Sequence, residues 1–394
     1  MAEPNGTARG TPGEVFLAFL KLGLTSFGGP IAHLGYFRDE LVTRRRWLDE
    51  AAYADLVALC QFLPGPASSQ VGFALGMMRA GWLGALAAWT AFTLPSALLL
   101  IVFALGAASL DGPVAAGVLH GLKLVAVAIV AQAVLGMAKS LTPDRERAAI
   151  AAVAVLILVL LGGTLGQVAA IGWGGLVGLR ACRSALVTSA VHPFFGSRTM
   201  GAILLAMFAL LLVGMPFIAG WGQGLAIFDA FYRAGALVFG GGHVVLPLLE
   251  TETVARGWVT PDAFLAGYGA AQAVPGPLFT FAAYLGTVAG GLPGAAIALV
   301  AIFLPGLLLV AGALPFWDQF RRWPWAQAAM RGANAAVVGV LAAALYDPVF
   351  LSAVLTPLDF AMALAGFVAL VAWKCPPWIV VLALGAMGGV IGAM

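Results

Sequence analysis

Long apolar stretches separated by short polar ones make up almost the whole chain of 394 residues. Four of these stretches lie at about 82–107, 113–138, 148–179 and 199–218. Because about 20 apolar residues suffice for a helix to cross a bilayer, we expect transmembrane helices at all four. Gly162-Gly163 divides the third stretch, which we therefore predict to be a helical hairpin. The pattern predicts an all-α polytopic membrane protein.

Two earlier apolar stretches are interrupted in the middle. The first is broken by Phe27-Gly28-Gly29-Pro30 and the second by Pro64-Gly65-Pro66. Proline removes a backbone donor and clashes with the preceding turn. In lipid, such a broken backbone persists only where protein buries it or where it lines a polar cavity. A helix over residues 51–63 would be about 20 Å long, which is short of the hydrocarbon core of about 30 Å. We therefore predict re-entrant or half-spanning helices at both breaks.

The same features return in the same order in the second half of the chain. Phe27-Gly28-Gly29 matches Phe239-Gly240-Gly241, Trp47 matches Trp258, Gln61 matches Gln272, Pro64-Gly65-Pro66 matches Pro275-Gly276-Pro277, and Leu94-Pro95 matches Leu304-Pro305. The offset falls slowly from 212 to 210 residues, as small loop deletions would cause. An ordered set of this kind indicates an internal duplication, and broken helices at matching places are typical of repeat-built transporters.

The distribution of basic residues predicts how the two repeats are oriented. Residues 38–46 hold four arginines, whereas the matching residues 250–258 hold Arg256 beside two glutamates. Lys and Arg mark cytoplasmic loops, so the repeats should be inverted relative to each other, with a cytoplasmic N-terminus. The expected organisation is a polar tail (1–12), a first transporter repeat (13–180), a linker with one extra transmembrane helix (181–224) and a second, inverted repeat (225–394).

Composition agrees with this picture and excludes several function classes. The chain is 62% hydrophobic and 9% charged, whereas soluble domains are about 25% charged. A net charge of +3 is too small to indicate a nucleic-acid partner. Cys60, Cys182 and Cys375 are far apart, which predicts neither disulfides nor a metal site. No catalytic motif is present, so an intramembrane enzyme is the weaker class and no cofactor is expected.

The breaks supply the candidate binding site. A helix that begins after Pro66 would leave its first amides free, and these amides with the positive end of the helix dipole favour an anion. Tight packing of small residues without a ligand is the alternative. The predicted substrate-binding residues are the broken backbone, nearby polar side chains and one intramembrane cation with its repeat counterpart: Gly28, Gly29, Pro30, Gln61, Pro64, Gly65, Pro66, Ser68, Ser69, Lys123, Gly240, Gly241, Gln272, Pro275, Gly276, Pro277, Thr280 and Asn334.

Charged groups inside apolar stretches are the second set of candidates, because such charges are expensive in a bilayer and usually functional. Lys123 lies in the middle of its predicted span, and we expect it to bind the anion; an internal structural ion pair is the alternative. The residues considered for charge or proton coupling are Lys21, Arg233, His33, His243, Glu40 and Glu252. Snorkelling, packed histidines and loop solvation are the respective alternatives for these groups.

The paired motifs resemble those of the chromate ion transporter family in its long, two-domain form. The resemblance rests on Phe-Gly-Gly followed by histidine, a basic stretch ending in Trp, Gln-x-x-Pro-Gly-Pro and Leu-Pro, and it covers all but the tail and linker. It implies an inner-membrane efflux carrier that confers chromate resistance and runs as an antiporter on the proton motive force. Gly242 opposite Pro30 and Asn334 opposite Lys123 depart from strict repeat symmetry.

We therefore hypothesise a carrier that exports a tetrahedral oxyanion, with chromate as substrate and protons as the coupling ion. A sulfate-like oxyanion or organic-anion carrier is the first alternative, because chromate and sulfate share shape and charge. An uncoupled anion channel is the alternative from another class. The expected partners are the bilayer, the anion and protons, with a homodimer left open.

Overall fold

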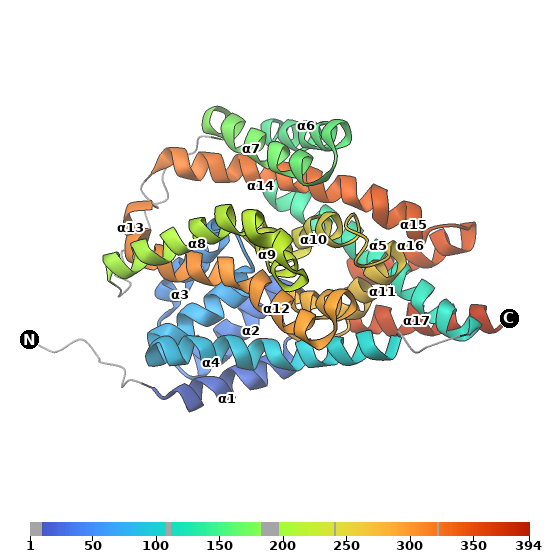
Figure 1. The fold of residues 1–394 in the computed structure, drawn as a ribbon, viewed down its shortest axis with the longest axis horizontal. Helices are drawn as coiled ribbons and strands as arrows, with labels where there is room; N and C mark the ends of the chain where they lie inside the picture. Colours follow the sequence, from blue (N-terminus) through green and yellow to red (C-terminus); the bar gives the residue numbers. More distant parts are fainter. Residues whose placement is uncertain (1–9, 108–111, 183–196, 240–241, 321–322) are drawn as a thin grey trace, which may run out of the picture.

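The computed structural model describes residues 10–107, 112–182, 197–239, 242–320 and 323–394. These residues form helices and turns without strands (Figure 1). The α-helices of the first half are α1 (Pro12–Thr25), α2 (Gly29–Phe37), α3 (Glu50–Phe62), α4 (Ala67–Ala107), α5 (Pro113–Leu141), α6 (Arg145–Leu161) and α7 (Gly163–Ala181). Those that follow are α8 (Arg198–Ile218), α9 (Gln223–Ala236), α10 (Val245–Thr253), α11 (Pro261–Ala271), α12 (Phe281–Ala313), α13 (Trp317–Phe320), α14 (Pro324–Ala344), α15 (Leu351–Ala353), α16 (Pro357–Val371) and α17 (Pro377–Ala393).

Short helices of other types connect several of these elements. They are the π-helices η1 (Arg38–Arg44) and η6 (Leu345–Phe350) and the 3-10 helices η2 (Ala219–Trp221), η3 (Gly242–Val244), η4 (Leu278–Thr280) and η5 (Leu314–Phe316). The predicted tail up to residue 9, residues 183–196 of the predicted linker, and Gly240 and Gly241 lie outside the described residues.

The predicted spans agree with the structure. The hairpin expected at 148–179 is α6 and α7, and the helices separate at Gly162, whose φ is +65°. The stretches 113–138 and 199–218 are α5 and α8. The second helix of α4 begins after Ala80 and Gly81, where the backbone leaves the helical region, and covers the stretch 82–107. α12 bends in the same way at Gly290 and Gly291.

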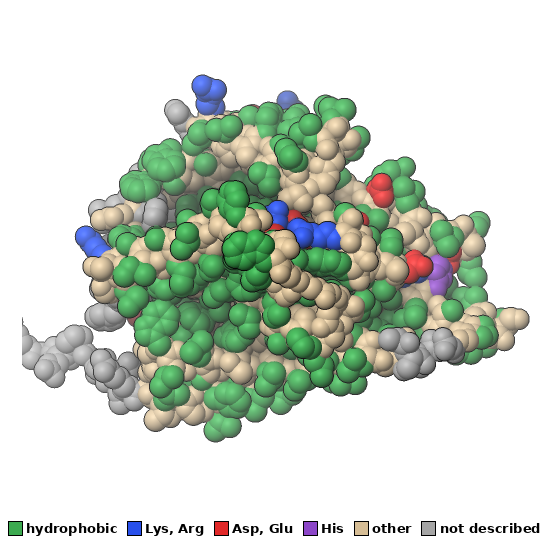
Figure 2. All heavy atoms as spheres, viewed as in Figure 1, with side chains coloured by type: hydrophobic (Ala, Val, Ile, Leu, Met, Phe, Trp, Pro, Cys, Tyr) green, Lys and Arg blue, Asp and Glu red, His purple; other side chains and the backbone are tan. Residues whose placement is uncertain are grey.

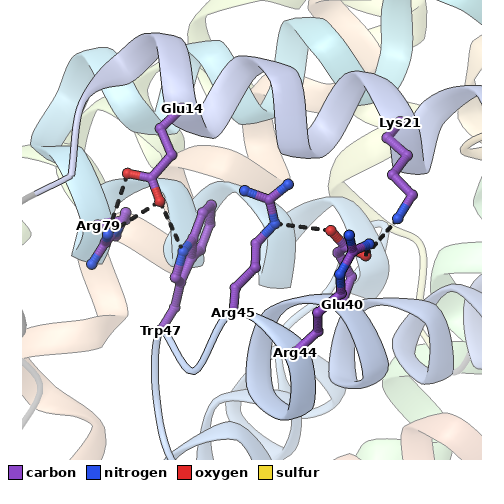
Figure 3. A network of polar contacts seen from close by, with 7 residues as sticks. All are labelled: Glu14, Lys21, Glu40, Arg44, Arg45, Trp47 and Arg79. Atoms are coloured by element: carbon purple, nitrogen blue, oxygen red, sulfur yellow. Dashed lines mark hydrogen bonds and ion pairs between the residues drawn. The ribbon is translucent and has the colours of Figure 1, made fainter.

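The Pro-Gly-Pro segment of the first repeat enters and leaves on one side. Trp47, just before α3, donates its indole N–H to Glu14 over 3.2 Å, and Arg79, where the first helix of α4 ends, donates to the same carboxylate over 3.1 Å. Figure 3 shows both side chains converging on Glu14 at the start of α1. Residues 48–78 therefore form a re-entrant hairpin, and α1, α2 and η1 before them also return to this side.

An even number of bilayer crossings in the first repeat, followed by one crossing in the linker, inverts the second repeat. After the two re-entrant segments, α4 and α5 are long and apolar enough to cross a bilayer. α6 and α7 form a hairpin, and a hairpin returns to the side on which it starts. The first repeat therefore ends on the side where it began. α8 crosses once more, with 21 residues and a length of about 32 Å. The second repeat therefore starts on the opposite face, as the charge pattern predicts.

The two repeats are interleaved rather than side by side. α5 of the first repeat packs against α16 and α17 of the second, and α14 of the second packs against α6 and α7 of the first (Figure 1). Glycines make these contacts close: a Cβ at Gly389 would be 2.9 Å from Val118 of α5. Small residues at helix crossings are how helices associate in membranes, where no hydrophobic force drives them together.

The surface is that of a membrane protein. Figure 2 shows hydrophobic side chains over most of the visible face, with charged groups confined to a few places. Within the described residues, five helices are long and apolar enough to cross a bilayer, among them α5 and the helix over Arg198–Trp221. The chain is therefore an all-α, multi-pass membrane protein built from two repeats.

Candidate functional site

The broken segments of one repeat are hydrogen-bonded to those of the other. The backbone N–H of Gly65 donates to the carbonyl of Val238 over 2.7 Å, and the N–H of Gly276 donates to the carbonyl of Ser26 over 2.9 Å. Gly65 and Gly276 are matching residues, and Ser26 and Val238 each directly precede a Phe-Gly-Gly motif. Each Pro-Gly-Pro segment is therefore joined to the residue just before the Phe-Gly-Gly motif of the other repeat by one backbone hydrogen bond, and the two bonds are equivalent by repeat symmetry.

The helices that carry these breaks have lengths that bring the breaks together inside the bilayer. α11 reaches from Pro261 to Ala271 and is about 16 Å long, and α1 is about 21 Å long. The two helices enter from opposite faces of a core about 30 Å thick. The glycine breaks themselves also touch, because a Cβ on Gly242 would lie 3.0 Å from Pro30. The four broken segments thus meet one another, and these helix lengths predict a meeting point inside the hydrocarbon core.

A small pocket lies where the glycine break of the first repeat meets Pro-Gly-Pro of the second. Its lining combines bare backbone with two polar side chains and several apolar ones: Gly28, Gly29, His243, Ala271, Gln272, Val274, Gly276, Leu278 and Pro377. Four of these, Gly28, Gly29, Gln272 and Gly276, are predicted binding residues, and His243 is a predicted coupling residue. We call this the junction pocket.

The polar side chains of the junction pocket are oriented by a buried tyrosine. His243 of η3 shares a hydrogen bond of 2.7 Å between its Nδ1 and the hydroxyl of Tyr268, which is fully buried in α11. The amide Nε2 of Gln272 is buried and makes no hydrogen bond within the described part of the chain. The bond to Tyr268 occupies Nδ1, so Nε2 is the nitrogen that His243 can offer to a ligand.

A second polar cluster lies in the first repeat, around the start of α4. Nδ1 of His33 is 3.4 Å from the hydroxyl of Ser68, and both residues are almost fully buried. The hydroxyls of Ser26 and Ser69 and the other ring nitrogen of His33 have no hydrogen-bond partner among the described residues. Buried polar atoms are normally satisfied, so this cluster has donors to offer a ligand. α4 begins at Ala67, directly after Pro66, as predicted.

The remaining predicted binding residues that the structure describes do not line the junction pocket. Thr280 donates its hydroxyl to the carbonyl of Pro277 over 2.8 Å, and Gln61 is exposed at the end of α3. Asn334 lies in α14, and its Oδ1 is buried without a hydrogen bond to the described residues. Pro64 accepts a hydrogen bond of 2.9 Å from Gln70, whose amide also donates to Gly306 of the second repeat over 3.0 Å.

Lys123 does not line the junction pocket. Its side chain is 9% exposed, and its Nζ lies 2.9 Å from the carboxylate of Asp262, which is 73% exposed at the start of α11. The long Lys side chain therefore reaches from the middle of α5 to a carboxylate in the first turn of another helix. This is the ion pair that the sequence left open as the alternative for Lys123.

Two charge networks occupy matching places in the two repeats. In the first charge network, Glu40 accepts from Lys21 over 2.7 Å, from Arg44 over 3.1 Å and from Arg45 over 2.9 Å (Figure 3). Burial alone would raise the pKa of Glu40, but these three cations lower it to about 2. Glu40, in the polar segment outside the candidate spans, therefore stays ionised at neutral pH.

The second charge network repeats this arrangement with different residues. Glu252 is 2.7 Å from Arg256 and 3.6 Å from Arg233, and Asp229 pairs with both arginines. Lys21 matches Arg233 and Glu40 matches Glu252, each at an offset of 212 residues. A cation over a tryptophan accompanies each network, since Arg45 lies over Trp47 and Arg256 over Trp258.

Sequence reasoning missed Asp229, Asp262 and Tyr268. A signal for Asp229 was present, because it lies four residues before Arg233 and so shares a helix face with it. Tyr268 matches Val57 in the first repeat, so repeat symmetry gave no reason to select it.

Comparison with known proteins places these features in a family. The family model described as "Chromate transporter" matches residues 13–179 and again residues 225–390. The chain is 32% identical to the chromate transport protein of Pseudomonas aeruginosa, over 95% of this chain and 90% of that protein. It is 30% identical to the probable chromate transport protein of Synechococcus elongatus, over 83% and 82%, and 27% identical to the chromate transport protein of Cupriavidus metallidurans, over 84% and 81%. No solved structure matches the chain.

Proposed function

This chain belongs to the chromate transporter family, and we propose from this premise that it exports chromate from the cytoplasm across the inner membrane. The observation that supports an oxyanion carrier is the meeting of four broken segments at the junction pocket. Broken backbone inside a bilayer is tolerated where it lines a cavity, and repeat-built carriers bind substrate at such breaks. Its N-terminus would lie in the cytoplasm, by the positive-inside rule.

In this proposal the junction pocket binds the anion through neutral donors. Nε2 of His243 and the amide of Gln272 would donate to the oxygens of chromate, with the bare backbone at Gly28 and Gly29 leaving room for it. The cluster of Ser68, Ser69 and His33 would supply donors on the first-repeat side. The anion would then exchange its hydration shell for fixed donors, and alternating access would open this one region first to one face and then to the other.

Electrical energy favours the outward direction. Moving one charge through 100 mV is worth about 2.3 kcal/mol, so a dianion that leaves a negative interior gains about twice that. Protons moved in exchange would change this balance. The networks hold Glu40 and Glu252 against arginines, which leaves His33 and His243, without a charged partner, as the groups we propose for proton coupling.

Chromate uptake into everted membrane vesicles tests the proposed function. We expect saturable uptake that rises with an imposed pH gradient, acid inside the vesicles, and that falls when an uncoupler removes the gradient. Excess sulfate should inhibit chromate uptake if the site recognises only the shape and charge of the anion. Flux that ignores the gradient would support the uncoupled channel instead, and sulfate uptake with a lower KM than chromate would reassign the substrate.

Replacing Tyr268 by Phe tests the junction pocket. The change removes the hydroxyl bonded to His243, and we expect KM for chromate to rise about fivefold, as for the loss of a hydrogen bond of about 1 kcal/mol. Tyr284→Phe is the matched control, because the Tyr284 hydroxyl donates to the carbonyl of Ala263 over 2.9 Å and Tyr284 does not line the pocket. An equal change of KM in both variants would argue against the pocket. Circular dichroism and a thermal scan would check that both variants fold.

A further inference from the structure

The first charge network holds more positive than negative charge. It has three cations, Lys21, Arg44 and Arg45, around the single carboxylate of Glu40. The second charge network has two arginines for two carboxylates and is neutral. Asp39 is exposed in the same turn as Glu40, and the first network keeps a net positive charge with Asp39 included. Because the repeats are inverted, the excess lies on one face of the membrane alone.

The cations of the first charge network are accessible, whereas its carboxylate is not. The side chains of Lys21 and Arg44 are 48% and 68% exposed, and that of Glu40 is 8% exposed. Arg45 reaches Glu40 through its Nε. Figure 3 shows the two terminal amino groups of Arg45 directed toward α1 and away from Glu40. Glu40 therefore holds the three cations in place without neutralising them.

This arrangement matches the chemistry of a divalent oxyanion. Arginine presents a planar fork of donors that binds two oxygens of an oxyanion at once, and lysine adds a compact point charge. A group with a surplus of up to two positive charges suits an anion with two negative ones. Monovalent chloride would gain less from the same charges.

The network is joined to the junction pocket by one short helix. Glu40 is in η1, which continues directly from α2, and Gly29 at the start of α2 lines the pocket. α2 has nine residues, so it spans about 14 Å. An anion held at the network is one short helix away from the pocket.

We propose that Lys21, Arg44 and Arg45 form a capture site for a divalent tetrahedral oxyanion, where the substrate is held before it enters the junction pocket. This rests on the proposed function, because it takes the transported anion as the ligand. The arginines also suit the positive-inside rule, and a topology anchor alone would not need three cations converging on one buried carboxylate.

Arg44→Gln and Arg46→Gln form a matched pair for the test. Both arginines are exposed in one polar segment and both changes remove one charge, but only Arg44 reaches Glu40. At low ionic strength we expect Arg44→Gln to raise KM for chromate in everted vesicles about fivefold, with kcat unchanged, and salt to reduce the difference. Arg46→Gln should change KM less than about twofold, whereas Arg44→Lys should recover only part of the loss, because lysine restores the charge but not the fork of donors.

A binding measurement separates failure of the capture site from failure of the proposed function. Sodium sulfate should raise the Tm of the purified wild type more than sodium chloride at equal ionic strength, and should raise that of Arg44→Gln less. Equal KM values for Arg44→Gln and Arg46→Gln, or equal sulfate shifts in wild type and Arg44→Gln, would overturn the capture site. A wild type that moves no chromate but still shows the sulfate difference would overturn the proposed function alone.

Discussion

Replacing Gly276 or Gly65 by alanine is expected to reduce transport strongly. Gly276 has φ of +99° and Gly65 has φ of +120°, and a non-glycine residue in such a conformation costs about 1–3 kcal/mol in backbone strain alone. A Cβ at Gly276 would lie 2.9 Å from the hydroxyl of Ser96, and one at Gly65 would lie 3.0 Å from the Cα of Gly306. Either change pushes one repeat away from the other and lengthens the hydrogen bond that joins them.

The two glycines should differ in one respect, which tests the site as well as the fold. Both variants should unfold at lower temperature than the wild type, but only Gly276 lines the junction pocket. Any transport that remains should therefore show a raised KM in Gly276→Ala and a wild-type KM in Gly65→Ala. Gly136→Ala is the control, because Gly136 is helical and a Cβ there meets nothing within 4 Å. A Gly276→Ala protein with wild-type Tm and KM would contradict this account.

Much of the architecture was predictable because the bilayer leaves few choices. Apolar length predicted α5 and α8, and the glycine pair at 162–163 predicted the separation of α6 from α7. The shortness of the segment before Pro64, together with the basic residues on either side, predicted a hairpin that returns to its own face. These are local properties of the chain, and a membrane converts them directly into geometry.

The contacts between the repeats could not be predicted from the sequence. Matching motifs show that Gly65 and Gly276 are equivalent, but not that each bonds the other repeat. Lys123 illustrates the same limit: its mid-span position predicted a buried cation, yet a side chain of that length reaches Asp262 in a helix 139 residues away. The role of Lys123 in binding stays a prediction. Hydrogen bonds between segments distant in the sequence can be found only in a structure.

Replacing Glu40 by glutamine is expected to destabilise the protein. Glu40 is the only carboxylate in the first charge network, and glutamine would leave Lys21, Arg44 and Arg45 facing one another without it. The three cations that remain are partly exposed to solvent, so we expect a loss on the order of 1 kcal/mol and a fall in Tm of a few degrees. Glu50→Gln is the control, because its ion pair with Arg38 is exposed on both sides and should contribute little.

The pH dependence of this loss follows from the pKa of Glu40. Burial opposes ionisation, but the hydrogen bonds from Lys21, Arg45 and Arg44 lower the pKa from 4.5 to about 2. A depressed pKa means that the stabilisation is complete above about pH 4.5 and is lost as the pH falls toward 2. The Tm difference between wild type and Glu40→Gln should therefore be constant near neutral pH and narrow across this acidic range. A difference that stayed constant down to pH 2 would show that shape, not charge, accounts for it.

Glu40→Gln should also respond to a divalent oxyanion. With the carboxylate gone, three cations remain, and sulfate placed among them would restore the missing negative charge. We expect sodium sulfate to raise the Tm of Glu40→Gln more than that of the wild type, whereas sodium chloride at equal ionic strength should act on both alike. Glu50→Gln should show no such rescue, since its exposed partner Arg38 is already hydrated. Equal responses of Glu40→Gln and wild type to sulfate would leave Glu40 with a purely structural role and would count against capture of the anion at this network.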